Sequence, residues 1–158
     1  MSGAVQYLSN KSSEVHIIEH LLQCNADFVP PLSSRVDINS YAKKIANRAM
    51  RFEAWSGDTL VGLVAAYCND RETRIAYITS VSVLKAWAGK GIATRLINQC
   101  FEHANALDMQ LIRLEVASSN TSAIRLYKKN GFVESRANAS FVTMDHYLKS
   151  GNEHEQQA

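Results

Sequence analysis

Hydrophobic and polar positions change their spacing several times along this chain of 158 residues. Between residues 13 and 49 the apolar positions recur every three or four residues, which is the spacing of one helix face. From residue 50 to residue 83 the dominant spacing is two, which is typical of strands. Helical spacing returns after residue 91, and shorter runs of both kinds close the chain. The pattern therefore predicts a mixed α/β fold.

Two helices are predicted before residue 50. Ser12 or Ser13 can cap the first helix, and Asp37 can begin the second. Between the helices, Pro30 and Pro31 interrupt the periodicity and predict an ordered, irregular loop. The expected apolar stripe of the first helix comprises Val15, Ile18, Leu21 and Leu22. The expected stripe of the second comprises Ile38, Tyr41, Ala42, Ile45, Ala46 and Ala49.

The middle of the chain is expected to form strands with short connections. Gly57 and Asp58 predict a turn after the first of these strands, and the polar residues 69–73 predict another turn before the last. Because short connections join antiparallel neighbours, these strands should form an antiparallel meander. The three expected meander strands comprise residues 50–55, 59–68 and 74–83, and residues 4–9 could form a separate first strand.

The clearest helix follows the meander and should cross over to a parallel strand. Residues 110–117 should therefore lie parallel to residues 74–83. A short capped helix should then end near Gly131, and residues 132–135 and 139–148 should close the sheet as a hairpin-like pair. The expected apolar stripe of the long helix comprises Ala93, Leu96, Ile97, Cys100, Phe101, Ala104 and Leu107.

Composition and charge are those of an ordinary globular domain, with 46% hydrophobic residues, 20% charged residues and a net charge of +2. The small charge and the lack of a basic cluster argue against a nucleic-acid partner. No apolar run approaches the ~20 residues of a transmembrane helix, so we expect no membrane association and a cytoplasmic location. We expect one domain at residues 1–149 and a disordered C-terminal tail at residues 150–158.

Cysteine and histidine spacing gives no metal site. Cys24, Cys68 and Cys100 are odd in number and widely spaced, which predicts reduced, partly buried thiols and leaves a catalytic cysteine as a minor alternative. His16 and His20 lie in HIIEH, which matches the zinc-protease pattern H-x-x-E-H. At about 100° per residue, both histidines should point away from the apolar stripe toward solvent, so no bound metal is expected.

A glycine-rich segment, AWAGKGIATRL at residues 86–96, separates the last meander strand from the long helix. A strand, a glycine turn and a helix start are typical of phosphate-binding loops. The segment lacks the GxxxxGK[ST] pattern of a nucleotide-triphosphate loop, and Thr94 stands where the dinucleotide fingerprint GxGxxG needs its third glycine. An antiparallel meander is also the wrong context for that fingerprint.

A third type of loop fits better. Residues 88–93 resemble the pyrophosphate loop of the GNAT superfamily of coenzyme A-dependent N-acetyltransferases, whose pattern is Gln/Arg-x-x-Gly-x-Gly/Ala. Gly91 and Ala93 match, whereas Ala88 stands where glutamine or arginine is usual. Residues 120–132 resemble the second signature, N-x-x-A-x-x-L-Y-x-x-x-G-F, at every defined position. The chain is thus identified as resembling this superfamily over residues 77–133.

The resemblance implies a GNAT-type central mixed sheet of about seven strands, an antiparallel meander followed by a splayed parallel pair, with about four helices. It also implies acetyl-CoA as co-substrate, with a β-bulge near Val81 to Val83 that opens the cleft and a backbone N–H near Val83 facing the thioester carbonyl. Lys90 and Arg95 could add positive charge at the diphosphate. The implied cofactor-binding residues are Val81, Ser82, Val83, Ala88, Gly89, Lys90, Gly91, Ile92, Ala93, Thr94, Asn120, Ala123 and Tyr127.

The implied reaction is acetyl transfer to a primary amine of a small molecule or peptide, by direct attack in a ternary complex. Tyr127 is the expected general acid for the leaving thiolate. Glu115, Tyr77 and Glu53 are candidates for the base, and Glu115 is carried forward as the second catalytic residue.

The resemblance also implies an acceptor wall in the proline-containing loop, where Phe28 and Arg35 could contact the substrate; Tyr77, in the expected strand at residues 74–83, is a further substrate-binding candidate. Two other classes of function stay open at this point, a non-catalytic coenzyme A-binding or regulatory interaction domain and an NAD-dependent oxidoreductase. An exposed edge strand would also allow a homodimer.

Overall fold

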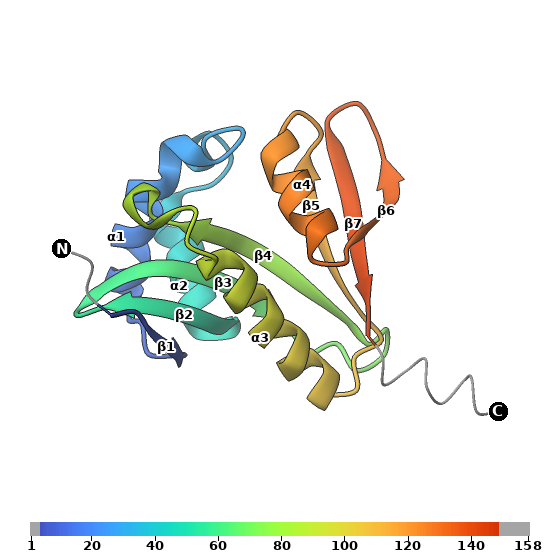
Figure 1. Cartoon of the computed structure of the whole chain (residues 1–158), viewed down its shortest axis with the longest axis horizontal. Coiled ribbons are helices and arrows are strands. Elements are labelled where there is room, and N and C mark those ends of the chain that lie inside the picture. The colour runs from blue at the N-terminus through green and yellow to red at the C-terminus, as the bar shows by residue number, and fades with distance from the viewer. Residues whose placement is uncertain (1–3, 149–158) are drawn as a thin grey trace.

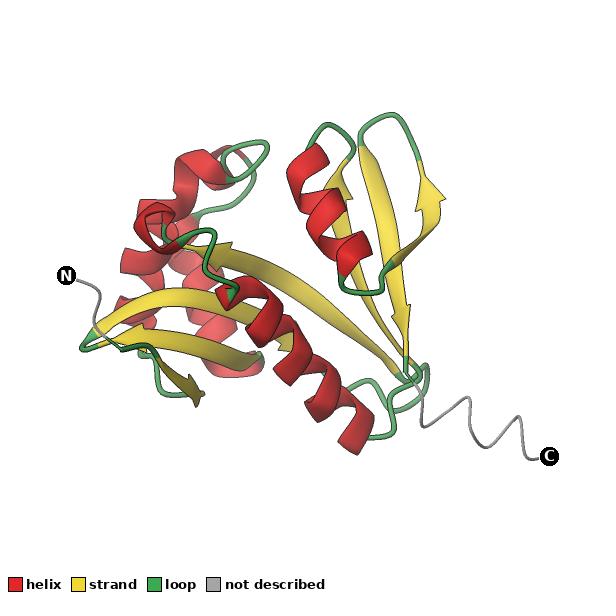
Figure 2. Cartoon of the chain, viewed as in Figure 1, coloured by secondary structure: helices red, strands yellow, loops and turns green. Residues whose placement is uncertain are grey.

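The computed structural model describes residues 4–148, which fold into one mixed sheet covered by helices (Figures 1 and 2). The strands are β1 (Gln6–Ser9), β2 (Met50–Ser56), β3 (Thr59–Tyr67), β4 (Ile75–Val83), β5 (Leu111–Ala117), β6 (Val133–Ala137) and β7 (Phe141–Tyr147). The α-helices are α1 (Glu14–Cys24), α2 (Ile38–Arg48), α3 (Ile92–Ala106) and α4 (Thr121–Lys129). Short 3-10 turns are η1 (Asn25–Asp27), η2 (Leu32–Ser34) and η3 (Lys85–Trp87).

The sheet has seven strands in the order β1-β2-β3-β4-β5-β7-β6. Strands β1 to β4 form an antiparallel meander, and β5 lies parallel to β4, as the crossover helix predicted. Strand β7 pairs antiparallel with both β5 and β6, which confirms the closing hairpin. The pairing of β4 with β5 covers only three residues of each strand, Ile75–Tyr77 and 111–113. Beyond that point the two strands diverge, and the ribbon has the shape of a V (Figure 1).

Helices cover both faces of the sheet. Helix α3 and the residues around α4 share one apolar cluster with the strands, which includes Leu96, Ile97 and Phe132. Helices α1 and α2 share a second cluster with the opposite face of the meander, which includes Leu21, Ile45 and Leu63. The meander is therefore buried on both faces, whereas the open end of the V is not filled by a strand (Figure 2).

Helix α1 buries a different face from the one predicted. Val15 and Leu22 of the expected stripe are 62% and 56% exposed. The buried residues of this helix are Ile17, His20, Leu21 and Cys24. The prediction was wrong because it counted a histidine as a solvent-facing residue, which rotated the assigned face of the helix. Ser13, not Ser12, is the N-cap, and its side chain accepts a hydrogen bond from the His16 N–H.

The other helices follow their predicted patterns more closely. Asp37 caps α2 by accepting a hydrogen bond from the Ser40 N–H at 3.1 Å. Most predicted core positions of α2 and α3 are buried, whereas Tyr41, Ala46 and Phe101 are partly buried. Ile92 replaces Ala93 in the α3 stripe, and Leu107 lies outside the helix, 43% exposed. Within residues 4–148 the three cysteines are free, and no helix is long and apolar enough to cross a bilayer. The predicted disordered tail, residues 150–158, lies outside the described residues.

A buried polar network attaches the segment before α1 to strand β2. The Glu53 carboxylate is fully buried and accepts hydrogen bonds from the backbone N–H groups of Lys11 and Ser12 and from the Trp55 indole. Arg51 forms an ion pair with Glu53 at 3.2 Å and also donates to the backbone carbonyl of Ser12. A buried charge is tolerated only when it is paired and hydrogen-bonded in this way.

Candidate active site

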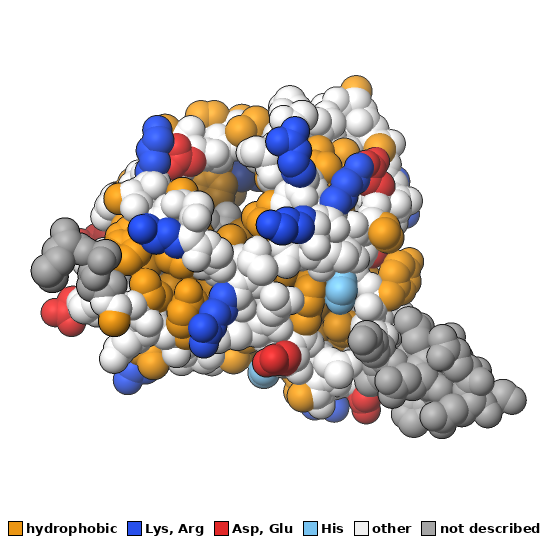
Figure 3. Space-filling model, in the orientation of Figure 1, with side chains coloured by type: hydrophobic (Ala, Val, Ile, Leu, Met, Phe, Trp, Pro, Cys, Tyr) orange, Lys and Arg blue, Asp and Glu red, His pale blue; other side chains and the backbone are white. Residues whose placement is uncertain are grey.

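The open end of the V contains a cavity of about 610 Å³. Figure 3 shows the surface hollowed there, between the part of the molecule that carries α1 and α2 and the part that carries α4. The cavity surrounds the end of β4, because β5 no longer covers that edge of the strand after Tyr77. Two ligands can therefore approach the same strand from opposite sides.

Most residues predicted from the sequence line this one cavity. On the side of α3 and α4 they are Val81, Val83, Ala88, Ala93, Asn120, Ala123 and Tyr127. On the side of the first two helices and across on β5 they are Phe28, Arg35, Tyr77, Ser82 and Glu115. The cavity thus brings together residues that are almost 100 positions apart in the sequence, which no local pattern could place side by side.

The remaining predicted loop residues lie at the N-terminus of α3, outside the cavity lining. Gly89 and Gly91 have φ angles of +77° and +80°, a left-handed conformation that favours glycine. Gly91 is the N-cap of α3, and no side chain caps this helix end. The first N–H groups of a helix lack partners in the preceding turn, so this end can receive an anion. Lys90 is exposed in the same loop.

Two of the predicted cofactor residues, Ile92 and Thr94, have their side chains occupied elsewhere. Ile92 is only 3% exposed and packs in the core, and Thr94 is a hydrogen-bond partner of Asn130 at 3.4 Å. Gly62 of β3 explains the position of Ile92, because a Cβ atom added at Gly62 would lie 2.7 Å from the Ile92 Cγ2 atom. The glycine thus lets the start of α3 pack directly on the sheet.

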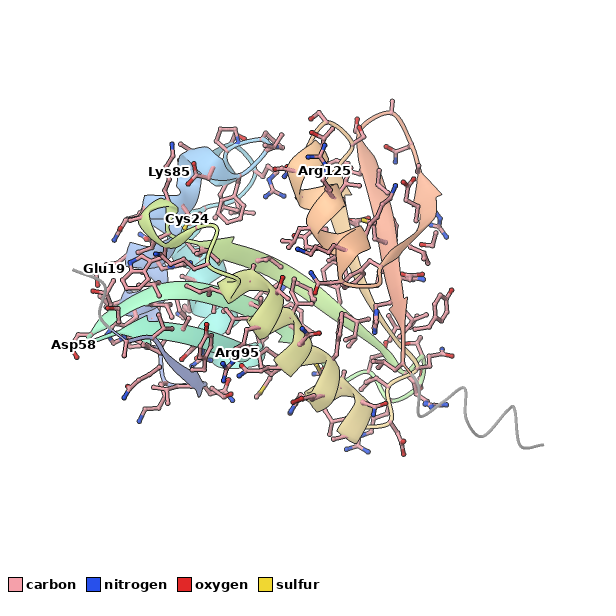
Figure 4. The ribbon with its side chains drawn as sticks, viewed as in Figure 1. Glu19, Cys24, Asp58, Lys85, Arg95 and Arg125 are labelled. Atoms are coloured by element: carbon pink, nitrogen blue, oxygen red, sulfur yellow. The ribbon has the colours of Figure 1, made fainter. Side chains whose placement is uncertain are left out.

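Positive side chains surround the opening of the cavity (Figure 3). Lys85 and Arg125 belong to η3 and α4, which lie on opposite sides of the opening (Figure 4). Arg95, which was expected to supplement the charge at the loop, instead lies over the Tyr7 ring, 4.2 Å from its centroid. Trp87, next to the loop, is partly buried and packs against the core.

A β-bulge in β4 lies two residues before the predicted position. Ile78 pairs with Ala66 and Ser80 pairs with Ala65, so Thr79 is the extra residue in β4. The backbone carbonyl of Thr79 accepts a hydrogen bond from the Tyr41 hydroxyl at 2.6 Å. The expected bulge at Val81 to Val83 was therefore placed too late, and a tyrosine of α2 packs beside the actual one.

Tyr127, the predicted general acid, is one of the residues that line the cavity. It lies on α4, lines the cavity and is 8% exposed, and burial raises its pKa to about 12. No described residue forms a hydrogen bond with its hydroxyl, which leaves that group available to a ligand. Asn120 caps the same helix by accepting a hydrogen bond from the Ala123 N–H at 3.2 Å, and it also lines the cavity. Its cap and its predicted ligand contact are therefore compatible.

The opposite side of the cavity combines aromatic and charged groups. Burial raises the pKa of Tyr77, and the charge of Glu115 on β5 raises it further. Burial likewise raises the pKa of Tyr41. Glu115 and Arg35 are exposed, and neither forms a salt bridge within residues 4–148. Both charges are thus open to a ligand in the cavity.

The structure also shows residues of this side that the sequence did not indicate. Cys24, Tyr41, Ser80 and Phe141 are examples. Ser80 is 5% exposed, and its hydroxyl has no hydrogen-bond partner within the described chain. Each of these residues carries the pattern of a core position or a strand, so no signal in the sequence distinguished it.

Two expectations about polar residues were wrong. His20 is 2% exposed and faces the sheet, where it contacts Leu60 and Ser82, instead of pointing to solvent. Glu53, a candidate base, lies in the buried network beside Arg51 and does not line the cavity. Among the described residues, no group of three or more His, Cys, Asp or Glu side chains is arranged to hold a metal ion.

The fold and the cavity together define a mixed α/β protein with a cavity between the diverging strands of its sheet. Residues 16–132 match the Acetyltransferase (GNAT) family. The chain therefore belongs to the GNAT acetyltransferase family.

Individual proteins show the same similarity. An uncharacterized N-acetyltransferase of Methanocaldococcus jannaschii is 33% identical over 88 residues, which make up 53% of this chain and 39% of that relative. The chain thus spans less than half the length of this relative.

Solved structures share the fold at low sequence identity. The NAA60 protein of Arabidopsis thaliana, solved with a bisubstrate analogue, superposes with a TM-score of 0.72 at 18% identity, over 92% of this chain and 98% of that one. The PaiA N-acetyltransferase of Thermoplasma acidophilum, solved with coenzyme A, gives a TM-score of 0.70 at 16% identity, over 94% of this chain and all of the other.

Proposed function

We propose that this chain is an N-acetyltransferase that transfers the acetyl group of acetyl-CoA to a primary amine by direct attack in a ternary complex. The observation that carries the proposal is the one cavity around the free end of β4. One of its sides is bounded by the glycine loop and α4, and the other by the segment between α1 and α2. A thioester and an amine held there from opposite sides would react without a covalent enzyme intermediate.

On the cofactor side, the α3 N-terminus would receive the diphosphate of acetyl-CoA, with Gly89, Lys90 and Gly91 at its approach. The pantetheine arm would follow β4 from Val81 to Val83, along the strand edge that β5 does not cover. The coenzyme A complex of the Thermoplasma neighbour supports a coenzyme A ligand for this fold.

The chemistry requires a proton donor for the thiolate and a proton acceptor for the amine. We assign the donor to Tyr127, whose hydroxyl has no hydrogen-bond partner among the described residues and stays protonated at neutral pH because burial raises its pKa to about 12. We assign the first proton acceptor to Glu115 of β5, which lies near Tyr77. Its carboxylate would attract the ammonium form of the amine and remove one proton from it.

The acceptor would enter between Phe28, Arg35 and Tyr77. Because Arg35 forms no salt bridge with another described residue, it can bind an anionic group of the acceptor. An aromatic side chain above the amine and a cation farther out would suit a small amino compound with an acidic group or the first residues of a peptide.

A thiol-release assay tests the proposal. Purified protein is incubated with acetyl-CoA and a panel of primary amines, both with and without an acidic group, and free coenzyme A is measured with a thiol reagent. We expect amine-dependent release with at least one acceptor, together with the acetylated amine in the mass spectrum. Binding of acetyl-CoA without release for any amine would instead support the non-catalytic coenzyme A-binding domain.

A further inference from the structure

A line of buried contacts connects α1 to β3 and β4 beneath the acceptor side of the cavity. The His20 Nδ1 atom lies 2.8 Å from the carbonyl oxygen of Leu60, and its Nε2 atom lies 2.9 Å from the Ser82 hydroxyl oxygen. A carbonyl oxygen can only accept, so Nδ1 carries the proton and donates it to Leu60. The Nε2 atom is therefore the acceptor, and the Ser82 hydroxyl donates to it.

The surroundings of His20 keep its ring neutral. Burial is the largest influence and lowers the pKa of His20, whereas its contacts with Leu60 and Ser82 partly oppose this effect. The third group that faces the ring is the Cys24 thiol, whose sulfur lies 3.7 Å from Nε2. Burial, and next the charge of Asp27, raises the pKa of Cys24 to about 11, although a hydrogen bond with Ser82 opposes this rise, so the thiol is also neutral at neutral pH. The ring thus presents an uncharged lone pair to Ser82.

Ser82 connects this buried ring to the reaction space. It lies on β4 between Val81 and Val83, and it lines the cavity on the side where the acceptor would enter. A hydroxyl that gives its own proton to Nε2 has two oxygen lone pairs. The Cys24 thiol, which is hydrogen-bonded to Ser82, can occupy one of them, and the other is left for an N–H donor in the cavity. No carboxylate of a described residue is hydrogen-bonded to Ser82, and Glu115 projects from a different strand, β5.

We propose that Ser82 is a catalytic residue that takes the last proton of the attacking amine and passes its own proton to His20. This inference rests on the proposed function. A primary alkylamine, whose pKa in water is about 10.4, arrives as an ammonium ion and loses two protons before it becomes an amide. Glu115 takes the first proton, and the relay of Ser82 and His20 takes the second.

Atoms and charge balance in this step. The amine nitrogen bonds to the thioester carbonyl carbon, and its N–H proton moves to the Ser82 oxygen while the Ser82 proton moves to His20 Nε2. The C–S bond then breaks, and the thiolate takes the proton of Tyr127. The proton held by His20 returns through Ser82 and cavity water to the Tyr127 oxygen. One proton per turnover leaves, through Glu115.

Matched variants test the relay with an amine found in the thiol-release screen and with hydroxylamine as a second probe. Hydroxylamine is largely unprotonated at neutral pH, and its adduct is acidic enough to lose a proton without a base. We expect Ser82→Ala and His20→Gln to lower kcat for the amine about 100-fold, the low end of general-base effects. The acetyl-CoA Kd and the hydroxylamine rate should stay within a few-fold. His16→Gln, one turn earlier on α1 and outside the relay, should retain the wild-type kcat.

The pH profile separates a relay from a structural role. Wild-type kcat should fall in acid as His20 protonates, at a pH below the ordinary value of 6.5 because burial lowers its pKa. This acid limb should be lost in His20→Gln. A His20→Gln variant with reduced thermal stability but an unchanged profile would overturn the relay, as would a Ser82→Ala variant with wild-type kcat. Hydroxylamine also cleaves thioesters without an enzyme, so each rate is taken after subtraction of the rate without protein. If the wild-type protein released no thiol above that background with any amine or with hydroxylamine, the proposed function itself would fail. If His20→Gln does not fold, Ser82→Ala alone decides.

Discussion

The two sides of the cavity are built in different ways. Apart from the edge of β4, the proposed cofactor side consists of two short continuous segments, residues 88–94 and 120–127, each at the N-terminus of a helix. The acceptor side collects single side chains from α1, α2, β4, β5 and the loop between the first two helices. Backbone groups of one segment can hold a diphosphate, whereas an acceptor must be recognised by side chains from several elements. Only the first kind of site leaves a motif in the sequence.

This difference suggests that single substitutions alter the acceptor side more easily than the cofactor side. Its side chains depend on buried polar contacts, such as the Glu53 network before α1 and the His20 contacts beneath β4. The cofactor side depends on backbone conformation at Gly91 and on close packing at Gly62. Variants that disturb one side should therefore leave the other nearly intact, except where they unfold the domain.

The largest effect is expected from Glu53→Ala, which leaves Arg51 buried without its partner. We expect the free energy of unfolding to fall by about 3–5 kcal/mol, because an uncompensated buried charge is costly. Chemical denaturation measures the change. The matched control is Glu134→Ala, which removes the exposed ion pair with Lys128 and should cost less than about 1 kcal/mol. Equal losses in both variants would contradict a supporting role for the buried network.

The next largest effect is expected on the cofactor side, from Tyr127→Phe. Loss of the general acid should lower kcat about 100-fold without changing the acetyl-CoA Kd. Steady-state thiol release and calorimetry measure these two quantities. Tyr147→Phe is the control, because Tyr147 is 53% exposed on β7 and does not line the cavity. A Tyr127→Phe variant with unchanged kcat would remove the assigned acid.

Close packing under the glycine loop is tested by Gly62→Ala. The added methyl group would meet the Ile92 Cγ2 atom at 2.7 Å, so we expect a loss of about 1–3 kcal/mol in stability and weaker acetyl-CoA binding. Thermal unfolding and calorimetry measure both changes. The double variant Gly62→Ala/Ile92→Ala should be more stable than the sum of the two single changes predicts, because the clash is relieved. Additive losses would mean that this contact does not position α3.

The smallest effect is expected from Arg35→Ala on the acceptor side. Loss of one charged contact should raise the KM about 10-fold for amines that carry an acidic group, which is about 1.4 kcal/mol. Amines without an acidic group should show no change, nor should the acetyl-CoA Kd. Arg48→Ala is the control, because Arg48 lies on α2 but does not line the cavity. An equal increase in KM for both kinds of amine would exclude recognition of an anion by Arg35.

Much of the fold could be predicted because the hydrophobic period follows secondary structure directly. The strand order in the meander, the parallel crossover and the caps at Asp37 and Asn120 were all predicted from local patterns. The buried face of α1 could not be predicted in this way. His20 lies on that face because it forms hydrogen bonds with Leu60 and Ser82, which are 40 and 62 positions away in the sequence. Periodicity assigns a polar residue to solvent and has no information about such distant partners.

The same limit applies to the site. The signature from residue 120 to residue 132 places Tyr127 correctly in the cavity, since it depends on one helix and its cap. The choice among candidate bases depended on which carboxylates reach the cavity, and this is decided by tertiary contacts. Glu53 is held in a buried network and Glu115 faces the cavity, although both lie in apparently similar strands.

Calorimetric titration with acetyl-CoA tests the central claim most directly, that the loop before α3 holds the diphosphate of coenzyme A. The wild-type protein should bind acetyl-CoA with a Kd of about 10⁻⁶ M and show no heat with NAD. Gly91→Glu should remain folded by thermal unfolding but lose binding, because a side chain at φ +80° and a negative charge at the helix start both oppose the ligand. Absence of acetyl-CoA binding in the wild-type protein, or undiminished binding in Gly91→Glu, would contradict this assignment.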